Sequence, residues 1–313
     1  MEVLLDIIMI PTVLATIKIA VIILLFVMPL GTVLTLMERK WSAMIQDRVG
    51  PNRANIGKFT GHGALHLAAD GLKSIFKEDT IPKGADSFLY LIAPFFGLIA
   101  GVATFAIIPV AGPIGDFTFQ VTDVEPGLLF IFAITSLSVY GAVLAGMSSN
   151  SKFALLGGTR ASAQMISYEV FMGLALMGIF MVYGTTRVSG IVDGQNEYWF
   201  GHLIPMWGVL TQPLGFVLFF TALIAETKRA PFDAPEGESE IVAGYFLEYS
   251  GMRWSAFMLA EYVALVGVAS LITTLFFGGY HVPWLHLWDS APQWLVTVLQ
   301  IIKFSVFTLF FCW

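Results

Sequence analysis

Repeated long runs of apolar residues set the tightest limit on what this chain can fold into. A helix that crosses a bilayer needs about 20 mostly apolar residues, and seven stretches meet this requirement. Charged residues make up only 12% of the chain, against about 25% in ordinary soluble domains. We therefore predict an all-α integral membrane protein, with residues 1–313 forming one transmembrane domain. The predicted spans are about 12–37, 87–111, 128–149, 164–183, 205–226, 255–277 and 293–313.

The basic residues between the spans predict an orientation. They gather in the loops after the first, third and fifth spans, whereas the opposite loops hold only Arg187. Cytoplasmic loops attract lysine and arginine, so we expect the N-terminus outside and these three loops inside. The single cysteine, Cys312, excludes an internal disulfide and a cysteine-based metal or iron–sulfur site within this chain.

Three glutamates lie within or at the end of the predicted spans, where an ionisable group costs a few kcal/mol or more. At about 1.5 Å per residue, Glu169 lies about 9 Å along the fourth span from its inner end, and Glu261 about 10 Å along the sixth. Glu226 is the last residue of the fifth span, at the same face. A structural hydrogen bond to a neighbouring helix would explain such groups, but we favour a site that moves charge.

An acidic inner loop, residues 226–254, joins two of these helices. If the stretch after Pro235 is helical, Glu236 and Glu240 share one face, four residues apart. Adjacent carboxylates disfavour each other's ionisation and can then accept and release protons near the working pH. The alternative is a solvated charged loop. The acidic residues are Glu226, Asp233, Glu236, Glu238, Glu240 and Glu248, against Lys228 and Arg229.

The first inner loop, residues 38–86, contains a second helix signal. Apolar residues recur at helical spacing, which predicts an amphipathic helix in the interface plane at about 60–79. The basic residues before it suit a polar headgroup or an acidic partner surface, or are ordinary cytoplasmic charge. His62 and His66 are four residues apart, but no third ligand accompanies them, so we predict no metal site. The apolar positions are Leu65, Ala68, Ala69, Leu72, Ile75 and Phe76.

Six segments of the chain match one family pattern in the same order. They are ERK at Glu38–Lys40, QDRVGPNR at Gln46–Arg53, ADGLKSIFKED at Ala69–Asp79, and the stretches Ser148–Val170, Ala225–Gly251 and Ala260–Tyr262. Together they closely resemble the quinone-site membrane subunit of respiratory NADH:quinone oxidoreductase (complex I), the family of the bacterial H subunit and the mitochondrial subunit 1. The resemblance covers nearly the whole chain. It implies eight membrane helices, so we expect that the chain is cut off before the last helix or lacks it.

The resemblance also implies roles for particular residues. In the family, the inner loops and the start of the bundle form a long chamber for the quinone substrate. His66 stands where the family generally has glutamine. By motif, the chamber entrance would involve Arg39, Gln46, Arg48, Arg53 and Asp70, with Arg229 and Asp233 deeper. A carboxylate path from the chamber toward antiporter-like subunits would contain Glu169, Glu226, Glu236, Glu238, Glu240, Glu248 and Glu261.

The expected function is that of a membrane-arm subunit of a proton-pumping NADH:quinone oxidoreductase. The resemblance implies no redox centre in this chain, with NADH, FMN and iron–sulfur clusters on partner subunits. It implies peripheral-arm, small and antiporter-like membrane subunits as partners, together with quinone and membrane lipid, and nothing suggests nucleic acid. We expect the bacterial cytoplasmic membrane, or alternatively the mitochondrial inner membrane.

Two alternatives stay open. A homologous subunit of a membrane-bound hydrogenase or formate-linked complex would share the fold without using quinone, but the GPNR and EGESE segments favour the quinone enzyme. A free-standing ion carrier would have no redox partner. Carriers often contain paired broken helices in matching halves, and the sequence contains no such pairing.

Overall fold

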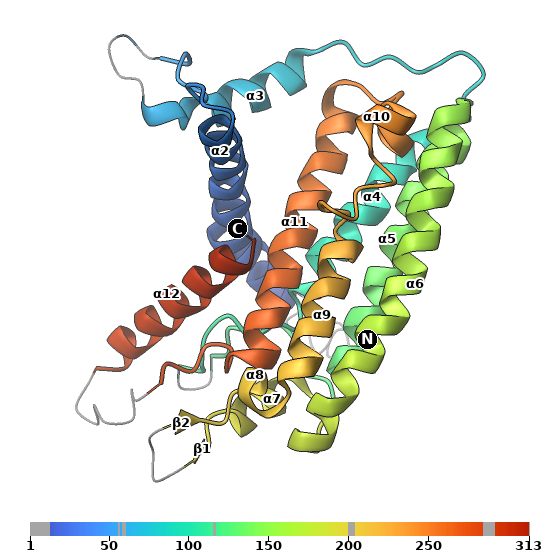
Figure 1. Cartoon of the computed structure of the whole chain (residues 1–313). Helices are drawn as coiled ribbons and strands as arrows, with labels where there is room; N and C mark the ends of the chain where they lie inside the picture. The colour runs from blue at the N-terminus through green and yellow to red at the C-terminus, as the bar shows by residue number, and fades with distance from the viewer. Residues whose placement is uncertain are drawn as a thin grey trace, which may run out of the picture.

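The computed structural model describes residues 13–55, 57, 61–114, 117–199, 204–283 and 292–312. Within these ranges, six helices are long and apolar enough to cross a membrane, and a shorter apolar helix, α9 (Pro213–Glu226), accompanies them. The predicted all-α membrane bundle is therefore confirmed (Figure 1). The six long helices are Val13–Ile45, α4 (Ser87–Thr104), α5 (Gly127–Ser148), α6 (Lys152–Tyr183), α11 (Gly251–Phe276) and α12 (Gln293–Cys312).

The first long helix contains one wide turn. The π-helix η1 (Ile23–Val27) leads directly into α2 (Met28–Ile45), and the amide of Met28 bonds to the carbonyl of Ile23. Pro29, in the first turn of α2, has no N–H, and its ring crowds the carbonyl four residues earlier. A π turn accommodates this without ending the helix. Pro29 is thus accommodated by a local widening of the helix.

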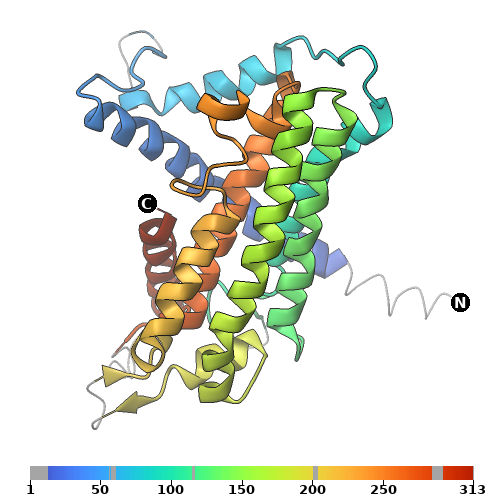
Figure 2. The same ribbon diagram turned by 45° about the vertical axis from the view of Figure 1, so that its right-hand side comes forward.

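Helix α11 lies at the centre of the molecule and contacts α2, α4, α9 and α12 (Figures 1 and 2). Helices α4, α5, α6 and α9 pack in this order, each against the next. Helices α5 and α6 approach so closely that a Cβ at Gly158 would lie 2.9 Å from the carbonyl oxygen of Ala142. Small residues of this kind allow close helix packing in membranes.

Several helix boundaries differ from the prediction, and the starts of α6 and α9 are two of them. Helix α6 begins at Lys152 rather than at 164, since Gly157 and Gly158 give this segment close packing partners despite its two basic residues. The fifth span was predicted at 205–226, but α9 begins only at Pro213 because Gln212 is non-helical (φ −136°, ψ 62°). Proline suits the first turn of a helix, so Pro213 begins α9 and does not kink it.

The bundle has two distinct ends. At the α3 end lie α3 (Leu65–Phe76), which contacts α11 and the 3-10 turn η2 (Gly61–Gly63), and α10 (Glu238–Ile241) and the 3-10 turn η3 (Gly244–Phe246), which contact α6. At the α7 end lie α7 (Val188–Gly194), α8 (Gly208–Thr211) and a small antiparallel hairpin of β1 (Tyr198–Trp199) and β2 (Ile204–Pro205). Helix α3 forms within the predicted amphipathic segment, and its apolar residues Leu72, Ile75 and Phe76 are exposed.

Helix α3 is tied to its neighbours at its middle and just beyond its C-terminal end. An ion pair of 2.5 Å between Arg39 and Asp70 joins it to α2. Beyond its C-terminal end, Asp79 forms an ion pair of 3.1 Å with Arg253 at the start of α11. Gly251 fits closely there, since a Cβ would lie 3.2 Å from the carbonyl oxygen of Lys77. Helix α3 is therefore a strap between α2 and α11.

The α7 end is packed and hydrogen-bonded around one buried amide. The side-chain oxygen of Gln195 accepts from the amides of Gly208 (3.1 Å) and Gly278 (2.9 Å), and its nitrogen donates to the carbonyl of Thr274 (2.9 Å). Lys303 donates to three carbonyls of the turn after α11. The apolar core next to this turn includes the buried residues Phe105, Ile107, Ile108, Leu128, Leu176, Ile179 and Phe276.

Candidate functional site

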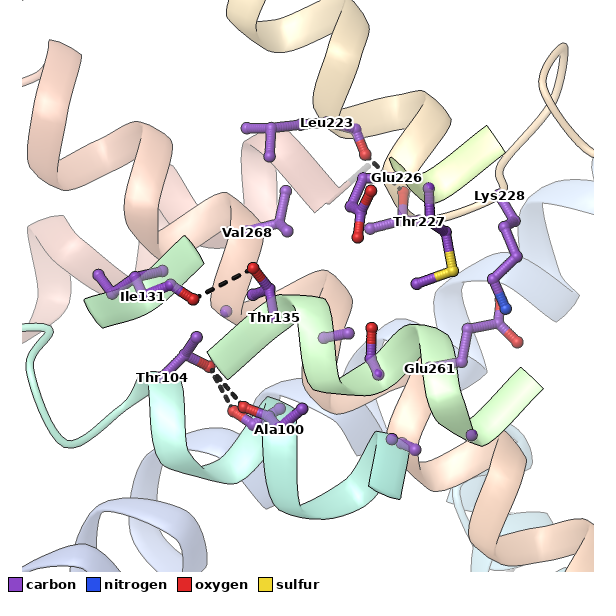
Figure 3. Close-up of a pocket in the computed structure, with 18 of the residues that line it drawn as sticks. Ala100, Thr104, Ile131, Thr135, Leu223, Glu226, Thr227, Lys228, Glu261 and Val268 are labelled. Atoms are coloured by element: carbon purple, nitrogen blue, oxygen red, sulfur yellow. Dashed lines mark hydrogen bonds between the residues drawn. The ribbon is translucent and has the colours of Figure 1, made fainter. Parts of the chain in front are cut away.

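A cavity of about 110 Å³ lies in the bundle between α4, α5, α6, α9 and α11. Glu226, Lys228 and Glu261 line one part of it, and apolar residues such as Ile131 and Val268 line most of the rest (Figure 3). One water molecule needs roughly 10–15 Å³ of such space, so the cavity has room for several. We call it the carboxylate cavity.

Glu226 ends α9 and points into this cavity (Figure 3). Its Oε2 atom is buried and has no hydrogen-bond partner among the described residues. Glu169 of α6 is close enough to interact electrostatically with Glu226, and it accepts a hydrogen bond from Ser136 of α5. An unpaired buried carboxylate oxygen is costly unless a proton or water satisfies it. The structure thus brings the predicted residues Glu169 and Glu226 together at one site.

Next to the cavity, three polar side chains form a compact triad. The ammonium of Lys228 lies 3.0 Å from Glu236 and donates to the hydroxyl of Tyr245 at 2.5 Å, while Tyr245 donates to Glu236 at 3.1 Å. Burial lowers the pKa of Lys228, but the neighbouring Tyr245 and Glu236 raise the pKa by more, so the net shift is upward. Burial raises the pKa of Tyr245. Lys228 is therefore a stable cation beside Glu236.

The expectation that Glu236 and Glu240 share a helix face was wrong. Helix α10 covers only Glu238–Ile241, because Gly237 has a non-helical backbone (φ −52°, ψ 109°). Glu236 turns toward Lys228, whereas Glu240 pairs with Arg160 at 2.6 Å and is 62% exposed. The two carboxylates therefore have separate cationic partners.

Arg229 links the first long helix to α11. Its Nη1 atom lies 3.0 Å from a carboxylate oxygen of Glu38, and its Nη2 atom lies 3.1 Å from Glu261. The hydroxyl of Tyr262 donates to the other oxygen of Glu38 at 2.7 Å. These roles of Glu38 and Tyr262 were not predicted from the sequence. The position of Glu38 in the matched ERK segment was the available signal, but residues 38–45 were interpreted as loop and are part of α2.

A second, open groove of about 630 Å³ lies between α2, the residues that follow it and α11. Arg48 in this groove donates to the side chain of Gln46 at 2.7 Å. The Nε2 atom of His66 accepts from the backbone amides of Arg53 (3.0 Å) and Ala54 (3.1 Å), which requires this nitrogen to be unprotonated. We call this the basic groove, whose lining includes Glu38, Arg39, Arg48, Arg53, His66 and Tyr262. Most of the predicted entrance residues are therefore neighbours.

Several predicted residues lie apart from these two spaces. Asp233 is exposed in the acidic loop. The backbone carbonyl of Glu248 accepts from Tyr90, at the start of α4. Glu238 belongs to α10, but its side chain lies outside the described part of the structure. The structure thus separates the buried carboxylates near the cavity from the exposed Asp233 and Glu240.

The groove and the cavity are connected through charged side chains. Glu38 lines the groove, Glu261 lines the cavity, and Arg229 contacts both carboxylates. A charge placed in the groove changes the electrostatic potential at Glu38 and Arg229, and less strongly at Glu261. Such coupling is stronger in a protein interior than in water because the effective dielectric constant is lower.

Comparison with known proteins supplies the family. The family model for NADH dehydrogenase matches residues 17–313. A protein of Geobacter metallireducens, the H subunit 1 of an NADH-quinone oxidoreductase, is 44% identical over 293 residues, which cover 92% of this chain and 82% of that protein.

Proposed function

Because this chain belongs to the NADH dehydrogenase family, we propose that it is the membrane-embedded H subunit of a proton-translocating NADH:quinone oxidoreductase. In this proposal, the basic groove is part of the quinone chamber, and the carboxylate cavity lies on the proton path. The observation that supports it most directly is the contact of Arg229 with both Glu38 and Glu261, which joins the two spaces.

The composition of the groove suits the quinone end of the reaction. Reduction of a quinone adds negative charge and creates a demand for protons. Arg39, Arg48 and Arg53 line the groove and supply cations that favour a negative headgroup or an acidic surface of a partner subunit. Partner subunits would carry NADH, FMN and the iron–sulfur clusters and deliver electrons to the quinone. The residues of this chain would orient the headgroup.

The carboxylates would supply the proton response. Negative charge in the groove attracts the guanidinium of Arg229, which then stabilises the Glu261 carboxylate less. Glu261 binds a proton more readily as a result. Its proton affinity is thereby linked to the charge on the quinone, and Glu226 and Glu169 would continue the path inside the bundle. From these carboxylates, protons would move toward antiporter-like membrane subunits.

The proposed location is a bacterial cytoplasmic membrane. Six long apolar helices make this a multi-pass membrane protein, and the compared relative is bacterial. The basic residues of the α3 end favour the cytoplasmic side for this end, with the N-terminus outside.

The matched pair Arg229→Met and Arg187→Met tests this function. Both substitutions remove a guanidinium, but Arg187 pairs with Asp123 at 3.8 Å near the α7 end. We expect Arg229→Met in the purified complex to lose at least tenfold in quinone reductase activity, with Arg187→Met near wild type. Both complexes should retain NADH oxidation by an artificial acceptor. Equal quinone reduction by the two intact variants contradicts the proposal.

Co-purification tests the identity of the complex. Flavin and iron–sulfur subunits are expected to accompany the chain in mild detergent. A nickel-containing partner would instead indicate a hydrogenase complex, and a solitary chain would indicate a carrier.

A further inference from the structure

We propose that the carboxylate cavity is also a binding site for a small hydrophobic cation, such as a protonated primary amine with a short aromatic or aliphatic group. The ammonium would contact Glu226, and the apolar part would occupy the space toward Ile131 and Val268. This inference rests on the proposed function only for the expectation that such a ligand inhibits the enzyme.

The charges around the cavity single out one unpaired carboxylate. Glu261 is paired with Arg229 at 3.1 Å, and Lys228 is paired with Glu236 at 3.0 Å. In contrast, the buried Oε2 atom of Glu226 has no hydrogen-bond partner among the described residues. A ligand that donates hydrogen bonds and carries positive charge would satisfy this oxygen.

Three hydroxyl groups of the wall also favour a ligand that donates hydrogen bonds. The hydroxyl of Thr104 donates to the carbonyl of Gly101 at 2.5 Å, and that of Thr135 donates to Ile131 at 3.1 Å (Figure 3). The hydroxyl of Thr227 donates to Leu223 at 3.0 Å. A hydroxyl has one proton, so these three groups can offer a ligand only their oxygen lone pairs. An ammonium group is complementary to these three hydroxyls.

The remaining wall fits a compact apolar body. It contains Phe132, Met165, Met172, Leu223 and Leu271, and the small residues of α4 and α11 keep the centre open. Methionine side chains adapt readily to the shape of a ligand. A neutral amine can cross the lipid, enter the cavity and become protonated beside Glu226. Apolar walls with few convergent polar groups are the usual composition of a small-molecule site.

Benzylamine is a suitable probe, with benzyl alcohol as its neutral isostere. In calorimetry on the purified complex at pH 7, benzylamine should bind at least tenfold more tightly than benzyl alcohol. Glu226→Gln should abolish that preference while the complex stays assembled. Val268→Phe, which fills the cavity, should weaken benzylamine binding at least tenfold, whereas Val217→Phe, on the exposed face of α9, should not.

Activity separates this inference from the proposed function. Benzylamine is expected to inhibit quinone reduction without competing with quinone. Binding that depends on Glu226 but leaves turnover unchanged would support the site and contradict a role of this cavity in the proton path. Equal affinity for amine and alcohol, or amine binding unaffected by both Glu226→Gln and Val268→Phe, would overturn the site itself. Displacement of benzylamine by sodium ions would also overturn it, since the site would then be one for a metal cation.

Discussion

The two ends of this bundle differ in how completely their buried charged and amide side chains are hydrogen-bonded. At the α7 end, the amide of Gln195 is satisfied by three neighbours, and the ammonium of Lys303 by three carbonyls. Among the described residues, the charged side chains with a buried, unpartnered atom are Glu226, Arg229 and Arg253, all toward the α3 end. Satisfied polar networks rigidify a protein, whereas incompletely satisfied ones stand ready to change their protonation or partners. The contrast predicts that changes at the α7 end lower stability and changes at the α3 end lower turnover.

The largest expected effect is on stability, from Gln195→Leu. This substitution leaves the buried amides of Gly208 and Gly278 and the carbonyl of Thr274 without their partner, at about 1–3 kcal/mol for each group. We expect the melting temperature of the purified complex to fall by several degrees, while quinone reduction per intact complex stays near wild type. If Gln195→Leu instead lowered turnover and left the melting temperature unchanged, the prediction that changes at the α7 end lower stability would be wrong.

The second effect is on turnover, from Glu226→Gln. The amide keeps the shape of the side chain but cannot bind or release a proton at neutral pH. Proton-coupled quinone reduction should fall about tenfold, which corresponds to about 1.4 kcal/mol in the activation barrier. Vesicle acidification and quinone reduction measure this, and the melting temperature should stay the same. Full activity would remove Glu226 from the proton path.

A smaller effect is expected for Arg48→Ala in the basic groove. Loss of this cation should raise the apparent KM for quinone about threefold, equivalent to about 0.7 kcal/mol. NADH oxidation by an artificial acceptor is the internal control, because that reaction does not need the groove. Equal losses in both assays would indicate failed assembly.

The smallest effect at the α3 end is expected for Glu240→Gln. This carboxylate is 62% exposed and paired with Arg160 at 2.6 Å, and exposed pairs contribute about 0–1 kcal/mol. Quinone reduction should fall less than twofold. A loss as large as that of Glu226→Gln would extend the proton path into the exposed loop and weaken the division between buried and exposed carboxylates.

Local sequence pattern was enough to predict most of the spans. A run of about 20 apolar residues can satisfy its backbone hydrogen bonds in lipid by forming a helix and has few other ways to do so. Helices α4, α5 and α11 therefore lie close to their predicted positions. The first part of α6 was not recognisable because Lys152 and Arg160 interrupt its apolar pattern. Its helical structure is supported by contacts of Gly157 with Gly244, far away in the sequence.

The site was predictable as a set of residues but not as a network. Glu169, Glu226 and Glu261 were identifiable because a charge in an apolar run is conspicuous. The pairing of Glu38 with Arg229 spans 191 residues, and no local pattern reports such a contact. The separation of Glu236 from Glu240 depends on the backbone of Gly237, which overrides their four-residue spacing.

The strap formed by α3 has a consequence for how the chain is made. Its first tie, between Arg39 and Asp70, needs only the early part of the chain. The tie to the start of α11 also includes the hydroxyl of Ser250, which donates to the carbonyl of Glu78 and lies 172 residues later in the chain. At about 5–20 residues per second, the ribosome needs roughly 10 to 30 s to synthesise that interval. During this time the nascent strap is tied to α2 at a single point. Closure of this face is therefore a late step of biogenesis, and a ribosome stalled before α11 would leave it open.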